Sequence, residues 1–267
     1  MKTKSLFWGS LFIVAGALLL LDNLGILYVN VWKLIWPTFI IAAGIWTLMV
    51  ASKGTSTEAL EVEHVSVPLE GITQGKMTLS FGAGQVRVKG DADEGQLYNG
   101  SFGGGVEYKS KKDGDFTKIT LMPDPTDFVQ TMMPWMWGAR EWSVNLSEEV
   151  VWQLHFEMGA SDTRVDLTDL KVTDLEVDTG ASNTKIILPA NAGQTHVDLS
   201  GGAASILFEI PEGVAARIQV DSGLAAINID RERFPRVGNF YKSENYETAA
   251  NKVDINADFG AGSLSIR

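Results

Sequence analysis

The sequence predicts an N-terminal two-helix transmembrane hairpin followed by an all-β domain, a β-solenoid or β-helix-like stack of short strands with rungs of about 21 residues. Three observations predict this. Two long apolar segments lie within the first 52 residues, polar and apolar residues alternate through most of the remainder, and a glycine-centred pattern recurs at a nearly fixed interval. Residues 1–52 are therefore assigned to the hairpin, 53–59 to a polar linker and 60–267 to the β-domain.

The hairpin is predicted from residues 5–21 and 34–52, neither of which contains a charged side chain. A spanning helix needs about 20 apolar residues, with a lower bound near 17. A signal peptide is the alternative for the first segment, because Lys2 and Lys4 precede its apolar stretch. However, no small-residue cleavage site precedes Asp22, and a second apolar segment follows at once. We therefore expect an anchor in the lipid bilayer.

The distribution of lysines predicts the orientation of the anchor. Lys2, Lys4 and Lys53 flank the hairpin on one side, whereas the connecting loop contains Lys33 alone. Positive charge favours the cytoplasmic side, so we expect two spans in a bacterial cell membrane and a cytoplasmic β-domain. An extracytoplasmic β-domain stays open as the alternative.

Period-two alternation of apolar and polar residues predicts half-buried strands after residue 60. It is visible in "LEVEHVSV", "QVRVKG", "TKIILP", "THVDLS" and "KVDINADF". The pattern is interrupted twice, and we expect a loop at 122–141 and an insertion between rungs at 231–251.

A repeat centred on glycine divides the domain into rungs. Its copies open at Gly159, Gly180, Gly202 and Gly223, at intervals of 21, 22 and 21 residues, and two further copies open at Gly82 and Gly260. Stacked in sequence order, such rungs bury a common core. Each glycine is expected to turn the chain with a positive φ, and the last copy is expected to complete the sheet. Pairs such as Val165/Leu167, Ile186/Leu188 and Ile227/Ile229 are expected to face the interior.

The segment Asp178-Thr179-Gly180 and its near-match Asp221-Ser222-Gly223 raise the possibility of an aspartic protease. The residues two before each repeat glycine are Ser80, Glu157, Asp178, Ser200, Asp221 and Asp258. The two aspartates are thus members of a repeated polar position. With one rung between them, they would lie roughly 9–10 Å apart, too far to share a proton. We interpret them as polar residues of turns.

Other catalytic and metal-binding patterns are weak. There is no cysteine, and His64, His155 and His196 show no metal-ligand spacing, so no metal site is expected. His196, Asp198 and Ser200 alternate along one strand, which is typical of a solvated face and not of a catalytic triad.

Binding motifs for small ligands are also missing. "FGGGVEY" lacks the helix and the Lys-Ser/Thr of a phosphate-binding loop, and no acidic turn matches a calcium-binding loop. A net charge of −11 argues against nucleic acid as a partner. We therefore expect no cofactor and no catalytic residues.

An unusual cluster of aromatic and methionine residues occupies 127–142. It contains Phe128, Met132, Met133, Trp135, Met136, Trp137 and Trp142. One interpretation is a cap over the end of the stack, because terminal rungs need covering. The other is an exposed apolar loop for a partner or the membrane surface, with the first six residues as the candidate interaction site.

Residues 6–50 resemble the LiaI–LiaF-like transmembrane region, through "LLLLDNLGIL" and "WPTFIIAAGIWTL". Residues 142–267 resemble the toast-rack or LiaF-like C-terminal β-domain, through "EWSVNLSEEVVWQLHFEMGASDTRVDLTDLKVTDLEVDTGASNTKIILP" and the later glycine turns; residues 60–121 look like the start of that domain. The resemblance implies a bacterial membrane protein linked to cell-envelope stress. In the LiaF branch it implies restraint of a membrane histidine kinase, although LiaF proteins usually have four spans and two are predicted here.

The expected function is that of a non-enzymatic, membrane-anchored protein of the cell envelope. It would sense or regulate envelope stress through protein–protein contact, with a membrane histidine kinase or another envelope protein as partner. The alternative is a membrane-tethered, adhesin-like or self-assembling structural β-solenoid, for which a homo-oligomer is expected.

Overall fold

The computed structural model describes residues 40–41, 61–124 and 140–267. The chain divides into two compact units, Met1–Thr57 and Glu58–Arg267. Apart from Ile40 and Ile41, which are helical, the two predicted spans lie outside the described residues. Within the described part, no helix has the length and apolar character needed to cross a membrane.

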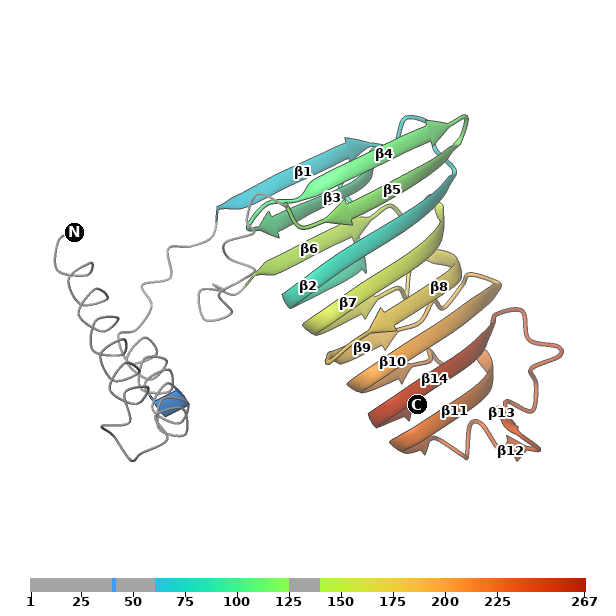
Figure 1. Cartoon of the computed structure of the whole chain (residues 1–267). Coiled ribbons are helices and arrows are strands. Elements are labelled where there is room, and N and C mark those ends of the chain that lie inside the picture. Colours follow the sequence, from blue (N-terminus) through green and yellow to red (C-terminus); the bar gives the residue numbers. More distant parts are fainter. Residues whose placement is uncertain (1–39, 42–60, 125–139) are drawn as a thin grey trace, which may run out of the picture. The chain divides into compact units, whose positions relative to one another are not determined.

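The described residues of the second unit form a fourteen-stranded sheet (Figure 1), which confirms the all-β prediction. Its strands are β1 (Val62–Pro68), β2 (Gln74–Gly90), β3 (Gln96–Gly103), β4 (Glu107–Asp113), β5 (Phe116–Met122), β6 (Glu141–Leu146), β7 (Val151–Asp166), β8 (Lys171–Thr179), β9 (Asn183–Ile187), β10 (Gln194–Glu209), β11 (Ala215–Ile229), β12 (Arg236–Val237), β13 (Phe240–Lys242) and β14 (Lys252–Ile266).

Five strands, β2, β7, β10, β11 and β14, are 15–17 residues long and form both arms of a bent sheet. The first halves are hydrogen-bonded in the order β5-β2-β7-β8-β10-β14-β11, and the second halves in the order β6-β2-β7-β9-β10-β14-β11. All of these pairs are parallel, and each keeps one register except β7 with β8, whose register shifts between Trp152 and Gln153. Alternating side chains of both arms point inward, so the apolar core lies between the arms, as in a solenoid.

The order of the last rungs differs from the sequence-based expectation. β14 lies between β10 and β11, with Ser200 opposite Asp258 and Asp258 opposite Asp221. The expected stacking in sequence order is therefore wrong for these strands. Every rung has the same alternation and the same glycine corner. The sequence pattern therefore does not show whether β11 or β14 pairs with β10.

The repeat glycines serve close stacking and not a left-handed backbone. None of the six has a positive φ, so that expectation was wrong. Instead, a Cβ added to four of them would come very close to the carbonyl oxygen of the repeat glycine on the neighbouring strand. The distance would be 3.0 Å at Gly180, 3.2 Å at Gly202, 2.9 Å at Gly260 and 2.9 Å at Gly223. A Cβ at Gly159 would be closer still to the carbonyl oxygen of Gly82, whereas one at Gly82 would meet nothing. The carbonyl groups of one strand thus occupy the space that a side chain on the next would need.

At one end of the stack, antiparallel pairs extend both arms: β3 pairs with β6 and β1 with β3 in the second arm, and β4 pairs with β5 in the first. Trp142 of β6 is fully buried there, with its ring centroid 5.1 Å from those of Phe81 and Phe102. Its Nε1 donates a hydrogen bond to the carbonyl oxygen of Gly103. The assignment of Trp142 to the aromatic loop was therefore wrong.

The six candidate interaction residues, Phe128, Met132, Met133, Trp135, Met136 and Trp137, lie outside the described residues, and their role stays a prediction. The chain on either side of them is described. Pro123 and the backbone of Arg140 both lie beside the bend of β2.

At the other end of the stack, the segment between β11 and β14 contains the short strands β12 and β13. β13 pairs antiparallel with β11 at Arg217 and Ile218 only. Phe234 and Tyr246 of the same segment are buried against the rungs. The segment predicted as an insertion at 231–251 thus covers part of this end of the core.

Candidate functional site

The outer face of the first arm carries three ladders of polar side chains, because in-register parallel strands place equivalent residues next to one another. The ladder nearest the bend contains Ser80, Glu157, Asp178, Ser200, Asp258 and Asp221. The second contains Thr78, His155, Glu176, Asp198, Asn256 and Gln219, and the third Lys76, Gln153, Asp174, His196, Asp254 and Arg217. Eight of these eighteen residues are Asp or Glu, and the two Lys/Arg residues lie on the outermost strands of the ladders. We call this surface the acidic face.

Several carboxylates of the acidic face lie directly opposite one another. Glu176 of β8 is opposite Asp198 of β10, and Asp258 of β14 is opposite Asp221 of β11. Like charges directly opposite on adjacent strands destabilise a sheet. Stability of the fold therefore does not account for this arrangement, which is suited to contact with positive charge.

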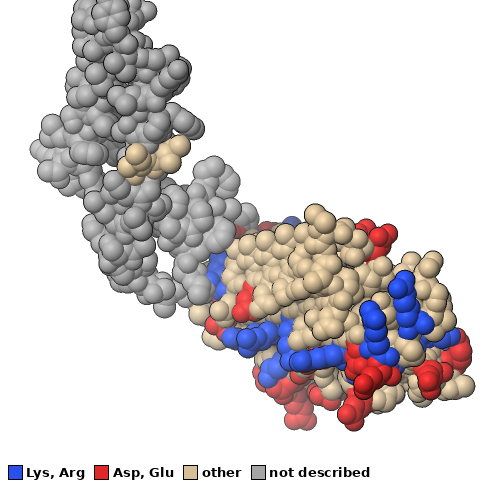
Figure 2. Space-filling view, turned by 90° about the horizontal axis from the view of Figure 1, so that it is seen from below, with Lys and Arg blue, Asp and Glu red and all other residues tan. Residues whose placement is uncertain are grey.

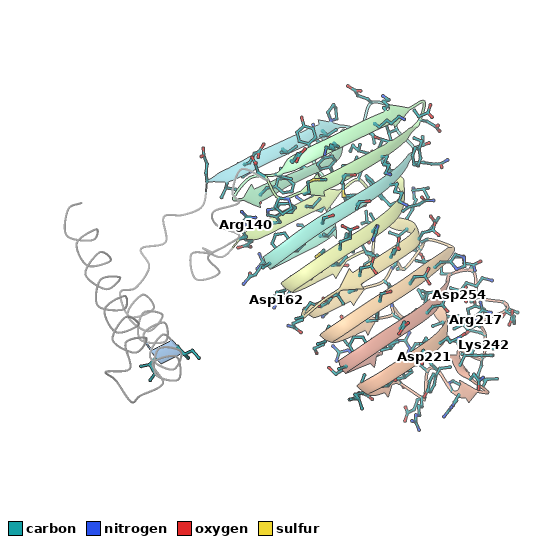
Figure 3. All side chains as sticks on the ribbon, in the orientation of Figure 1. Arg140, Asp162, Arg217, Asp221, Lys242 and Asp254 are labelled. Atoms are coloured by element: carbon teal, nitrogen blue, oxygen red, sulfur yellow. The ribbon has the colours of Figure 1, made fainter. Side chains whose placement is uncertain are left out.

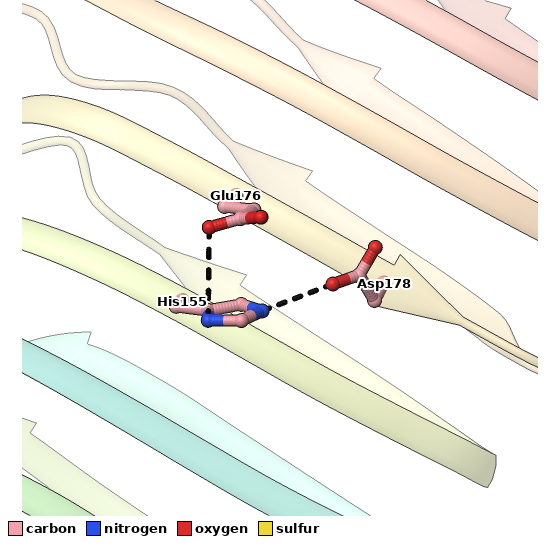
Figure 4. A group of neighbouring side chains, drawn as sticks. All are labelled: His155, Glu176 and Asp178. Atoms are coloured by element: carbon pink, nitrogen blue, oxygen red, sulfur yellow. Dashed lines mark hydrogen bonds and ion pairs between the residues drawn. The ribbon is translucent and has the colours of Figure 1, made fainter.

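His155 of β7 lies beside Glu176 and Asp178 of β8 (Figure 4), and Glu157 of its own strand is also near. Its Nε2 lies 3.0 Å from Oδ2 of Asp178 and 3.8 Å from Oε1 of Glu157, and its Nδ1 lies 3.6 Å from Oε2 of Glu176. The imidazole is only 19% exposed. A protonated imidazole would neutralise part of the surrounding negative charge and hold β7 to β8.

Among the described residues, His155, Glu176 and Asp178 form the one group whose ligand atoms all lie close enough together, within 4.8 Å, to hold a metal ion. Imidazole and carboxylate ligands would suit Zn²⁺ or another divalent transition metal. The sequence-based search missed this group because its members are 21 and 23 residues from His155, the spacing of adjacent rungs. Only the stacking of β7 on β8 brings them together.

The bend of the stack forms a shallow groove of about 810 Å³ beside the acidic face. Ser80, Glu157, Asp178, Ser200 and Asp258 line it, and the Ser80 hydroxyl donates a hydrogen bond to Glu157. In Figure 2, a broad area of the β-domain carries no charged side chain, and charges of both signs gather along one border.

The position of β14 also decides the protease hypothesis. Asp178 lies on β8 and Asp221 on β11, with β10 and β14 between them. Three strand spacings separate the two carboxylates by roughly 14 Å, even more than the sequence order suggested. They cannot share a proton, so this pair does not form an aspartic-protease site.

Asp254 of β14 is the buried centre of a polar network at the end of the strands far from the bend (Figure 3). It accepts hydrogen bonds from the hydroxyl of Tyr246 at 2.5 Å and from Nε2 of Gln194 at 2.9 Å, and it forms an ion pair with Arg217 at 2.7 Å. Burial, followed by the hydrogen bond to Asp254, raises the pKa of Tyr246 to about 12. Because Tyr246 belongs to the segment between β11 and β14, this network fastens that segment to the rungs.

The predicted solvated face of β10 is confirmed: His196, Asp198 and Ser200 are all exposed. Asp198 accepts a hydrogen bond from Asn256, and His196 lies 3.8 Å from Asp254 of the neighbouring strand. Each side chain thus interacts across the sheet and not along β10, so the three do not form a nucleophile–base chain.

The outer face of the second arm carries one basic ladder beside charges of both signs, including Lys89, Asp162 and Asp166. Arg87, Arg164 and Lys185 are equivalent residues of β2, β7 and β9, and they line a hollow of about 610 Å³. Lys185 forms an ion pair with Glu209 at 2.8 Å, and the hydrogen bonds from Lys185 and then from Arg267 lower the pKa of Glu209. The second arm therefore carries a basic ladder, which the acidic face of the first arm lacks.

A bent, parallel β-stack with charged outer ladders defines a β-solenoid-like class of protein. Residues 55–209, more than half of the chain, match the family model described as the N-terminal domain of toast_rack, DUF2154, and the chain belongs to this family. Residues 6–48 match the LiaI-LiaF-like transmembrane region, which makes this a membrane-associated chain and confirms the resemblance seen in the sequence.

A solved structure shares the fold. A putative cell adhesion protein from Clostridium sporogenes ATCC 15579 is 20% identical, with a TM-score of 0.67 over 77% of this chain and 98% of the other. A putative adhesin from Bacteroides fragilis NCTC 9343 is 5% identical, with a TM-score of 0.30 over 78% and 97% of the two chains. No curated protein matches the sequence.

Proposed function

We propose that this protein is a non-enzymatic, membrane-anchored component of the bacterial cell envelope that senses or regulates envelope stress by protein–protein contact. The observation that carries the proposal is the acidic face, where carboxylates oppose carboxylates on adjacent strands. Natural surfaces accept such a cost where a cationic partner compensates for it, because complementary charge speeds and orients association. The partner would present a basic segment, on a membrane histidine kinase or another envelope protein.

The membrane arrangement belongs to the same proposal. Residues 5–21 and 34–52 would span the bilayer twice and leave the β-domain in the cytoplasm. Reporter fusions after Arg267 test this arrangement: a reporter active only in the cytoplasm supports it, and one active only outside contradicts it.

The contact is tested with two matched double variants of the full-length, tagged chain. The first is Glu176→Gln with Asp198→Asn, which neutralises two carboxylates that face each other. The second is Arg164→Gln with Lys185→Gln, which neutralises two facing cations on the other arm. Each removes one repulsive pair together with surface contacts worth less than about 1 kcal/mol, namely those of Glu176 with His155, Asp198 with Asn256 and Lys185 with Glu209, so both variants should stay folded.

Envelope proteins recovered by crosslinking in membranes are then compared. We expect the first variant to lose a partner that wild type and the second variant retain. Equal recovery by all three proteins, or no envelope protein recovered by wild type, would contradict the proposal.

The second candidate function is that of a membrane-tethered adhesin-like or self-assembling structural module. It is favoured by the fold shared with a protein described as a putative cell adhesion protein. An extracytoplasmic reporter result would favour this function over intracellular regulation.

A further inference from the structure

The free edge of β11 is the feature that the function proposed above leaves unused. From Gln219 to Ile229, β11 is hydrogen-bonded to β14 on one side. On its other side, β13 pairs only with Arg217 and Ile218, and no further strand of the described residues follows. Eleven residues of strand edge therefore offer unpaired backbone groups along both arms.

This edge lacks the protection that sheet edges usually have. Residues 222–229, "SGLAAINI", contain no charged residue and no proline, and Leu224 is 90% exposed. Val220 and Ile227 are only partly buried, although their neighbours Ala257 and Leu264 on β14 are buried. The apolar side chains of β11 therefore lack a neighbouring strand that would complete their burial.

The opposite end of the stack is protected. Its first arm ends in β4, whose sequence "EYKSKKD" carries five charged residues in seven. Its second arm ends in β1, which contains Glu63 and ends at Pro68. Lysines and prolines on edge strands oppose pairing with another chain, so this end is a poor partner for β11.

We propose that the free edge of β11 pairs antiparallel with β11 of a second copy of this chain, around a two-fold axis through the bend at Gly223 and Leu224. Such an axis exchanges the two arms, so the first arm of one copy continues into the second arm of the other. The apolar interiors then lie on the same side and merge. A strand without a matching bend could pair along one arm only.

Side-chain direction fixes the register of this pairing. Inward Val220 would lie opposite inward Ile227 of the other copy, since side chains on one face of an antiparallel pair must match. Outward Asp221 then lies opposite Ala226, and Gln219 opposite Asn228. No like charges meet. Because both copies use the one end of the described stack that lacks this protection, the assembly closes as a dimer and does not extend into a fibre.

The register predicts opposite effects for two substitutions at one exposed position. Ala226→Asp places a new carboxylate opposite Asp221 in both halves of the dimer, whereas Ala226→Lys places an ammonium there. The mass of the full-length chain in detergent micelles is measured after subtraction of the detergent. We expect wild type and Ala226→Lys at twice the mass of one chain, and Ala226→Asp at the mass of one chain. A monomeric wild type, or the same mass for both variants, would overturn the proposal.

The absence of native cysteine allows a second measurement. In Asp221→Cys/Ala226→Cys, each new thiol should face its counterpart in the other copy, and oxidation should give a covalent dimer. The two sites are too far apart along an extended strand to bond within one chain. Glu107→Cys/Lys112→Cys on β4 has the same spacing on the protected edge and should stay monomeric. Equal crosslinking of both pairs, or none at 221/226, would contradict the β11 dimer.

Neither measurement depends on the envelope partner. If the chain proves monomeric, the comparison of the acidic-face variants by crosslinking is still valid. Loss of the partner in those variants would leave the mass of the chain unchanged.

Discussion

The repeat glycines can be tested one against another, because they share a sequence pattern but differ in the space around them. An alanine Cβ at Gly159 would lie closer than 3.0 Å to the carbonyl oxygen of Gly82, a backbone atom that cannot rotate away. The two strands must separate locally, and overpacking of this kind costs about 1–3 kcal/mol. An alanine at Gly82 meets nothing within 4 Å and needs no left-handed φ. It should stabilise the protein by about 0.4–1 kcal/mol, because alanine lowers the conformational entropy of the unfolded chain relative to glycine.

We therefore expect Gly159→Ala to be less stable than Gly82→Ala by roughly 1.5–4 kcal/mol. Urea unfolding of the full-length variants in detergent, followed by the fluorescence of the buried Trp142 and Trp152, measures this difference. Gly202→Ala, with a Cβ distance of 3.2 Å, should fall between the two. Equal unfolding free energies for Gly82→Ala and Gly159→Ala would refute close stacking as the reason for the glycines.

Two further predictions concern pH. Tyr246→Phe should cost about 1.5–3 kcal/mol below pH 10, because it removes a hydrogen bond to the buried carboxylate of Asp254. The raised pKa of Tyr246 means that this difference shrinks between pH 10 and 12, because the unfolded wild type loses its phenolic proton above about pH 10 while the folded protein keeps it until about pH 12; a constant difference up to pH 12 would argue against the network. Glu209→Gln should cost less than about 1 kcal/mol at neutral pH, because Glu209 pairs with Lys185 and Arg267 at the surface. Its lowered pKa means that the cost fades as the pH drops below the ordinary pKa of Glu, and an effect that grows in acid would contradict the assignment.

Local patterns in the sequence predicted the strands and the interior faces. Val165, Leu167, Ile186 and Leu188 are buried as their alternation indicated. Ile227 is only partly buried because it lies on an edge strand, and sequence alternation does not reveal which strand is an edge. The order of β10, β14 and β11 was not predictable for the related reason that all three have equivalent pairing edges.

The candidate site was predictable only in part. The ladder that contains Asp178 and Asp221 was visible as a repeated polar position and exists in the structure. The group of His155, Glu176 and Asp178 was not visible, because two of its members come from a different position in the rung. Finding it needs the stacking of β7 on β8, which places Glu176 next to His155 and Asp178 next to Glu157.

The place of β14 between β10 and β11 has a consequence for folding during synthesis. When β11 leaves the ribosome, its partner β14 has not been made, and the edge of β10 is open. β11 has the alternation and glycine corner that fit this edge, so direct pairing of β11 with β10 would compete with the final order and would have to separate before β14 could enter. Asp254 contacts both Gln194 of β10 and Arg217 of β11, and these two contacts exist together only when β14 lies between the two strands.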